Sequence, residues 1–561
     1  MLRLHWGTKP SRAKYFPCLR EVHIVVSSPD MHRCSPSVRF PSIQFNLFLF
    51  FSFLTHLPGG TIGTGLFVGS GQALSIAGPS MLLAGYTTIS ILVYGMITAT
   101  AEMSTYLPVT GCSMAYYGSR FVSQSLGFAM GWLYWYSFGI LIAYEITAAS
   151  LVINYWPNNV PIGVWITIML IVIVGLNFCP VRYYAETEFW FASLKVFMII
   201  GLLMLSFILF WGGGPDRQRL GFHYWKDPGA AKEYLVGGSG GYFCAYLYVT
   251  TFSVFAFNFA PELLVITAGE MQDPQKNLPR AAKRYFYRLV IFYIGGTLAV
   301  GVICNSNASG LTNGTGSAAS PWVIAIKNAG IHGLDSVVNA VIITSAWSSG
   351  NSYLYMSSRV LYSLAISKNA PAIFTRCNRW GVPYVSVSAC SVFALLAYLN
   401  LSNNTTEVFN WLINLTNTAG FTSWVCCSII YIRFRAACKA QGIHISSLPY
   451  HSITQPWMAW LCMFTFTILC LCNGFSVFFP GHWSVSSFLT AYLGLPVFFG
   501  IYFGHRLYSY KHPWAYKPED VDLQSGLDAV RELAGVNDSP SEDLETSRSR
   551  RWLNKLKVLW E

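Results

Sequence analysis

Twelve long apolar runs constrain the fold of this sequence more than any other feature. About 20 apolar residues in a helix, each rising 1.5 Å, match the roughly 30 Å hydrocarbon core of a bilayer. The predicted spans cover residues 43–72, 80–101, 126–155, 162–180, 188–211, 241–266, 287–304, 336–362, 385–401, 406–432, 457–479 and 486–505. We therefore expect an all-α membrane protein with about twelve transmembrane helices over residues 43–506, a cytoplasmic N-terminal segment over 1–42 and a cytoplasmic C-terminal tail over 507–561.

The charge distribution supports a membrane protein and predicts its orientation. Only 11% of the residues are charged, against about 25% in soluble domains. The net charge of +12 comes from Lys and Arg in alternate loops, which argues against a nucleic-acid partner and places both termini in the cytoplasm by the positive-inside rule. Glycosylation sequons in loops predicted to face outside agree with this topology, and they begin at Asn307, Asn313, Asn400, Asn403 and Asn404.

Neither the cysteines nor the glycines form a catalytic or cofactor motif. The 14 cysteines contain no C-x-x-C pair and have no histidine partners at metal spacing, so they are interpreted as small apolar residues. Gly63 and Gly65 are followed by Val68 instead of a third glycine, and no lysine follows as a nucleotide-binding loop needs. We expect no enzyme activity, no bound metal and no organic cofactor.

Two spans contain residues that weaken a helix. Residues 59–71 read GGTIGTGLFVGSG, and each glycine costs about 1 kcal/mol relative to alanine in a helix interior. Five spans later, Pro261 interrupts the sixth span. Irregular backbone survives at membrane depth only inside protein or beside a watery cavity, and broken helices at matching positions of two halves mark the binding sites of transporters. Helix N-termini would attract a carboxylate, and freed carbonyls would accept from an ammonium group.

Few ionisable side chains lie inside the predicted spans. They are His56, Glu102, Glu145, Lys195 and Glu262. Charges at such depth are costly, and they usually face the bundle interior, pair with one another or line an ion pathway. For the two residues nearest a span end, Glu102 and Lys195, the alternative is that the side chain extends to the membrane interface.

These motifs identify a family resemblance. Besides the glycine segment, the sequence contains AGPSMLLAGYTTISILVYGMITATAEMSTYLP at 77–108, AETEFWFASLKV at 185–196, ELLVITAGEMQDPQKNLPRA at 262–281 and SSGNSYLYMSSRVLYSLA at 348–365. Over residues 59–520, the chain resembles the fungal amino-acid permeases, the yeast amino-acid transporter branch of the amino acid/polyamine/organocation superfamily. The resemblance implies a five-plus-five inverted-repeat core with broken first and sixth helices, two further helices, and amino-acid import across the plasma membrane by alternating access with a proton as coupling ion.

The resemblance also assigns roles to individual residues. The first-helix glycine segment would hold the substrate carboxylate, and the sixth-helix break would hold the amino group. The implied substrate-binding residues are Thr61, Ile62, Gly63, Thr64, Gly65, Phe257, Asn258, Phe259, Ala260 and Glu262. Lys195 matches a fifth-helix lysine that titrates a proton in some relatives, with Glu102, Glu145 and Glu262 as candidate partners.

Several alternatives stay open from the sequence. Loop motifs such as RWGVPY at 379–384 resemble the dicarboxylic amino-acid permease group, but they do not line a site, so the substrate side chain is undetermined. Residues 1–58 are either a divergent lead-in or a gene-model artefact, and residues 552–560 form either an interfacial helix or part of a disordered tail. An amino-acid sensor on the same scaffold, or an inactive product of a damaged gene, are the competing functions. The oligomeric state is also open.

Overall fold

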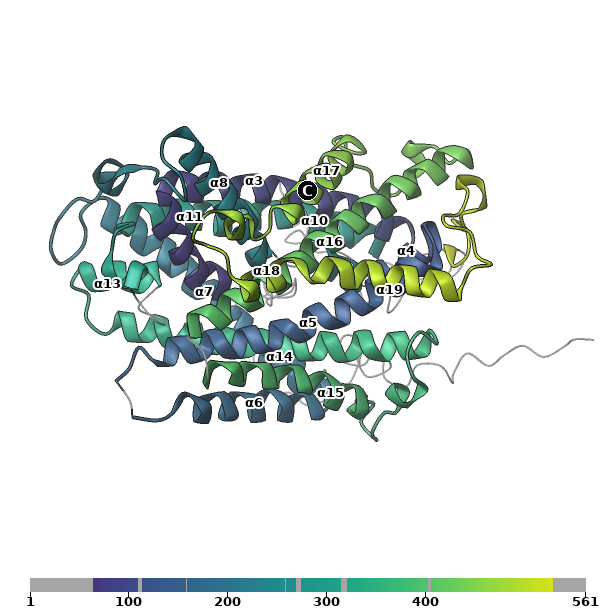
Figure 1. The fold of residues 1–561 in the computed structure, drawn as a ribbon, viewed down its shortest axis with the longest axis horizontal. Helices are drawn as coiled ribbons and strands as arrows, with labels where there is room; N and C mark the ends of the chain where they lie inside the picture. Colours follow the sequence, from purple (N-terminus) through teal and green to yellow (C-terminus); the bar gives the residue numbers. More distant parts are fainter. Residues whose placement is uncertain are drawn as a thin grey trace, which may run out of the picture.

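In the residues that the structure describes, every regular element is a helix (Figure 1). The computed structural model describes residues 64–108, 113–157, 159–257, 259–268, 274–313, 320–401 and 405–527. The alternatives for residues 1–58 and for 552–560 lie outside these ranges, as do Thr61, Ile62, Gly63 and Asn258. Within them, each predicted span coincides with one helix or with consecutive helical segments, which confirms an all-α membrane fold with about twelve spans.

The first two spans form one helical stretch that is kinked at Gly78. The π-helical turn η3 (Gly65–Gly69) leads into α3 (Ser70–Tyr106). Together they contain 42 residues, or roughly 60 Å of helix, which is twice the depth of the hydrocarbon core. Gly78 has φ 79° and precedes Pro79, and a Cβ there would lie 2.9 Å from the Ala230 carbonyl oxygen. The first span therefore extends to residue 77, a few residues beyond the predicted end.

Five other spans are single helices. They are α5 (Gln124–Ile153), α6 (Ile162–Phe178), α7 (Val181–Phe210), α14 (Leu334–Ile366) and α16 (Thr405–Ala440). The remaining spans are built from segments. These are α8 (Ser239–Ser253), η5 (Val254–Phe257) and α9 (Ala260–Ala268); α10 (Pro274–Arg288), η6 (Leu289–Ile294) and α11 (Gly295–Ile303); α15 (Tyr384–Ser391) and η9 (Val392–Leu401); α17 (Trp457–Leu471) and η11 (Phe475–Phe478); and α18 (Val485–Tyr492) and α19 (Gly494–Tyr508).

Short helices lie in the connections. They are α4 (Met114–Phe121), η4 (Trp225–Gly229), α12 (Ser309–Asn313), α13 (Pro321–Asn328), η8 (Ala372–Thr375), η10 (Ile445–Ser447) and η12 (Pro518–Asp520). By length and hydropathy alone, six described helical stretches qualify as membrane spans, and the pair α18 and α19, bent by 42°, makes a seventh. The apolar helices α6 and α17 are too short for this length criterion, but they coincide with the fourth and eleventh predicted spans.

The packing pairs spans that are five apart in the chain. The third and eighth spans, α5 and α14, lie side by side along their lengths (Figure 1). The first and sixth spans also meet, because η3 contacts η5 and α3 contacts α8 and α9. This pairing is what two five-helix repeats require. Large apolar side chains on α7 and α17 are exposed, such as Phe207 at 67% and Phe464 at 59%, and exposed apolar side chains of this kind fit contact with lipid.

The predicted C-terminal tail begins with a segment that packs on the helix bundle. The backbone N–H of Tyr516 donates to the Val122 carbonyl at 2.9 Å, and the Gln441 amide donates to the Val521 carbonyl at 2.6 Å. Leu523 is fully buried, and Arg120 forms an ion pair of 3.3 Å with Asp522. Residues 509–527 thus connect the region of α4 to α16.

One of the glycosylation sequons is inaccessible in this fold. Asn400 is buried, and its amide donates to Thr147 Oγ1 at 3.0 Å and to the Ala397 carbonyl at 2.6 Å. Asn307 lies exposed in the connection between α11 and α12. Of the two positions, only Asn307 presents its side chain to modification.

The orientation leads to a labelling prediction. A cysteine at Asn307, which is exposed, should react with a membrane-impermeant maleimide on intact cells. A cysteine at Ser367, exposed at the opposite end of α14, should react only after the cells are permeabilised. The unsubstituted protein serves as the control for its native cysteines. Labelling of Ser367→Cys on intact cells would overturn the assignment of both termini to the cytoplasm.

Candidate functional site

The sixth span is broken at the position that Pro261 predicts. After α8, the chain tightens into the 3-10 turn η5, and α9 begins at Ala260. Phe259 has φ 55°, a conformation that is rare for a bulky residue and costs roughly 1–2 kcal/mol. The Tyr293 hydroxyl donates to the Ala256 carbonyl at 2.9 Å, so a carbonyl near the break is satisfied by a side chain and not by the next turn of helix.

Aromatic rings surround this break. Phe257 stacks on Tyr293 with ring centroids 4.2 Å apart, and the ring of Phe259 lies 5.0 Å from that of Phe138. Phe257 and Phe259 are both fully buried. The predicted site residues Phe257, Phe259 and Ala260 therefore lie together in an apolar environment.

Glycines in the first and second spans allow close contact with the sixth. A Cβ at Gly65 would lie 2.7 Å from a ring carbon of Phe255, and one at Gly85 would lie 2.6 Å from Val249. Both distances are too short for real atoms, so only glycine fits without a shift of the neighbouring side chain. The glycine segment is thus a contact surface between η3 and η5 as well as a weak point in the helix.

Thr64, the first described residue of the glycine segment, contacts the third span. Its hydroxyl lies 3.0 Å from Glu145 Oε2 and 3.1 Å from the Tyr144 hydroxyl. All three side chains are buried. A carboxylate in this position needs hydrogen bonds and a counter-charge, since an unpaired charge inside a protein is strongly destabilising.

Lys195 supplies that counter-charge from the fifth span. Its side chain is 1% exposed, so it faces the protein interior and does not extend to the interface. The ammonium donates to Ser349 Oγ on α14 at 3.1 Å, and it interacts electrostatically with Glu145, Glu188 and Arg288. The structure therefore brings together two of the predicted coupling residues, Glu145 and Lys195.

The other two predicted glutamates have partners of their own. Glu102 is fully buried and forms an ion pair with Arg435 on α16, while the backbone N–H of Ser452 donates to it at 3.4 Å. Glu262, at the start of α9, accepts from the hydroxyl of Ser423 and from Trp424 Nε1 at 3.3 Å. The structure thus holds both glutamates against α16 instead of grouping them with Lys195.

Residues that the sequence interpretation did not single out complete the network. Tyr144 contacts Thr64, and Ser348 and Ser349 contact charges on α7. The two serines lie inside the quoted motif SSGNSYLYMSS, and a run of small hydroxyl residues inside an apolar span was an available signal. Nothing local to α14 indicates that they contact α7.

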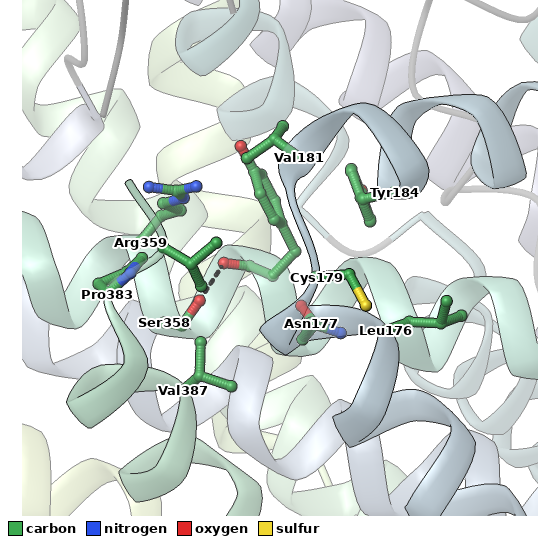
Figure 2. A pocket seen from close by; sticks show the side chains of 11 residues that line it. Leu176, Asn177, Cys179, Val181, Tyr184, Ser358, Arg359, Pro383 and Val387 are labelled. Carbon is green, nitrogen blue, oxygen red and sulfur yellow. Dashed lines mark hydrogen bonds between the residues drawn. The ribbon is translucent and has the colours of Figure 1, made fainter. Parts of the chain in front are cut away.

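A separate hollow lies between α6, α7, α14 and the start of α15, and its space, open solvent included, is about 270 Å³. Figure 2 shows its lining, in which Arg359 and Ser358 come from α14 and Tyr184 from α7. The rings of Tyr184 and Tyr355 stack at 4.3 Å, and the Arg359 guanidinium lies 4.9 Å from the centre of the Tyr355 ring. None of the predicted substrate or coupling residues lines this hollow, which lies at the helix ends predicted to be cytoplasmic.

The chain is also similar in sequence and in fold to known proteins. The chain matches the family model described as Amino acid permease over residues 54–514. It is similar to the Proline-specific permease of Emericella nidulans, with 46% identity over 503 residues that cover 89% of this chain and 90% of that protein. The Dicarboxylic amino acid permease of Saccharomyces cerevisiae is 40% identical over 83% of this chain and 77% of that protein. A solved manganese transporter of Eremococcus coleocola shares the fold, with a TM-score of 0.52 and 13% identity over 84% of this chain and 94% of that chain.

The glycine contact predicts the effect of a single methyl group. Gly65→Ala should lower the melting temperature of the purified protein, because the Cβ must displace the Phe255 ring, and overpacking of this kind costs about 1–3 kcal/mol. The matched control is Gly201→Ala on α7, where nothing lies within 4 Å of the new Cβ. Equal melting temperatures for both variants would show that the two spans are not in close contact.

The Glu102–Arg435 pair predicts a loss of stability that is not additive. Glu102→Ala leaves Arg435 without its buried partner, which costs about 3–5 kcal/mol for a buried pair. Thermal unfolding should therefore shift by several degrees in either single variant. The double variant with Arg435→Ala and Glu102→Ala should lose less stability than the sum of the losses of the two single variants. Strict additivity would contradict a direct pair.

Proposed function

We propose that this chain, which belongs to the amino acid permease family, imports amino acids across the plasma membrane as a proton symporter that works by alternating access. The observation that carries the proposal is the buried contact of Thr64 with Glu145, together with the electrostatic partnership of Glu145 and Lys195. These contacts connect the glycine segment of the first span to a titratable pair on the third and fifth spans.

Substrate binding would use the two broken helices. Backbone N–H groups and hydroxyls of residues 61–65 would hold the carboxylate, because the N-terminal end of a helix favours negative charge. Backbone groups at the break between Phe257 and Ala260 would hold the amino group. Broken helices that supply backbone atoms at the midplane are the arrangement by which inverted-repeat transporters bind charged groups.

Proton coupling would use the charge of Lys195. When Lys195 is protonated, its ammonium compensates Glu145, whose carboxylate accepts from Thr64 on the first span. When Lys195 loses its proton, Glu145 becomes a buried charge without compensation, and the contact to the first span changes. The protonation state would thereby select the arrangement of the first span that accepts substrate.

The proposed substrate class is small amino acids with apolar side chains, and proline is the first candidate. Phe257, Phe259 and the ring of Tyr293 give the break an apolar wall, which suits a ring and penalises a second charge. The relatives named above carry the descriptions Proline-specific permease and Dicarboxylic amino acid permease. Acidic substrates are therefore the alternative that the experiment must distinguish.

The test is radiolabelled uptake by permease-deficient yeast that express the chain. The panel contains proline, alanine, glutamate, aspartate and lysine, each with and without a protonophore. The proposal expects accumulation of proline that the protonophore abolishes. Accumulation of glutamate or aspartate alone would show that the substrates are acidic amino acids. Binding without uptake would favour a sensor. Uptake that ignores the protonophore would reject proton symport.

Lys195 gives the sharper prediction. Lys195→Ala should reduce concentrative uptake by about tenfold or more, since a positioned proton-transfer group contributes roughly a hundredfold or more to a proton-dependent step. Exchange of substrate between the two sides, which needs no net proton movement, should persist. The control is Lys283→Ala, which removes an exposed lysine on α10. A variant at Lys195 that still accumulates substrate with the wild-type pH profile would remove Lys195 from the mechanism.

A further inference from the structure

Glu188 lies on the same face of α7 as Lys195, two helical turns closer to the predicted cytoplasmic end. Seven residues separate them, which corresponds to about 10.5 Å along the helix. The Ser348 hydroxyl donates to Glu188 Oε2 at 2.7 Å, and its neighbour Ser349 accepts from Lys195 at 3.1 Å. Consecutive serines of α14 therefore contact the two opposite charges of α7.

The contacts between α7 and α14 continue toward the hollow. One turn before Glu188, the Tyr184 hydroxyl donates to Ser352 Oγ at 3.2 Å, and Tyr184 itself lines the hollow (Figure 2). Lys195, Glu188 and Tyr184 on one helix thus face serines of the other in three successive contacts. We name this set the α7–α14 polar seam: Tyr184, Glu188, Lys195, Ser348, Ser349 and Ser352.

Glu188 has acceptor capacity that the fold does not use. Its Oε1 atom is buried and has no hydrogen-bond partner among the described residues. A buried acceptor left without a partner costs about 1–3 kcal/mol, so packing alone gives no reason to keep it. The Oε1 atom therefore has an open acceptor position.

We propose that Glu188 accepts the proton that Lys195 releases and passes it to the hollow, which makes the α7–α14 polar seam the inward proton path; this inference rests on the proposed proton symport. An N–H bond of Lys195 breaks, an O–H bond of Glu188 forms, and the hydroxyls of Ser349 and Ser348 with intervening water carry the proton between them. The ammonium becomes an amine as the carboxylate becomes an acid, so the summed charge of the pair does not change. In a low-dielectric interior, this avoids leaving a charged Glu188 beside a neutral lysine.

The charged groups that face the pair come from each helix packed against it. Glu145 on α5 attracts the ammonium of Lys195, and Arg288 on α10 opposes it. Tyr353 on α14 interacts electrostatically with both Glu145 and Glu188. Arg359 lines the hollow at the end of the seam. Once the proton has reached Glu188, its neighbours on the inward side are hydroxyls, and the hollow opens beyond them.

The test uses the purified full-length protein in liposomes, with radiolabelled L-proline and an imposed pH gradient. Glu188→Gln keeps an acceptor for Ser348 but cannot take a proton, so gradient-driven accumulation should fall about tenfold while proline exchange at equal pH on both sides stays near the wild-type rate. Its matched control is Glu186→Gln, which changes an exposed carboxylate on the same helix and should accumulate proline as the wild type does.

Ser348→Ala provides a second variant that leaves the charges in place. It should lower accumulation in the same direction as Glu188→Gln, again with exchange preserved. Wild-type accumulation in Glu188→Gln overturns the proposal, and so does an equal loss of exchange and accumulation in both variants, because that pattern indicates a purely structural role. A wild-type protein that carries proline without response to the gradient instead rejects the proposed proton symport, whatever Glu188 does.

Discussion

The structure depends on the compensation of one buried ammonium group. A charge in the interior of a membrane protein is tolerated only when it is paired or hydrogen-bonded. Lys195 meets this requirement through Glu188 on its own helix, Glu145 on α5 and Ser349 on α14. Because Glu145 also contacts Thr64, this set of contacts joins the first, third, fifth and eighth spans. One charge thus constrains the relative positions of four spans.

Two different devices position the first and sixth spans around this charge. On one side, Gly65 and Gly85 remove the side chains that would separate the helices. On the other, the positive φ of Phe259 and the proline that follows the start of α9 interrupt the sixth span where it meets them. Local backbone strain at a bulky residue persists only when the surrounding packing holds it, and the stacked rings of Phe257 and Tyr293 provide that packing.

The fold and part of the site follow from sequence patterns, because apolar length, glycine and proline act locally. The twelve spans, the break beside Pro261 and the location of Glu145 and Lys195 inside the bundle were predictable for this reason. The partners of Glu102 and Glu262 were not, since Arg435 and Ser423 lie more than 150 residues away in the chain. Glu188 was missed because it lies at the edge of a predicted span, where an ionisable residue is unremarkable. Its contact with Ser348 exists only once α7 and α14 are packed.

The segment over residues 509–527 has a mechanical consequence. Arg120 on α4 donates to the carbonyls of Asp522 and Ser525, while Arg433 on α16 and Gln441 just after it donate to carbonyls of the same segment. Each such bond contributes about 0.5–1.5 kcal/mol, so sliding α4 relative to α16 would require several to break at once. The segment therefore resists movement of these two helices relative to each other, whereas the π-helical turn η3 and the 3-10 turn η5 interrupt the regular α-helical hydrogen bonding of the first and sixth spans.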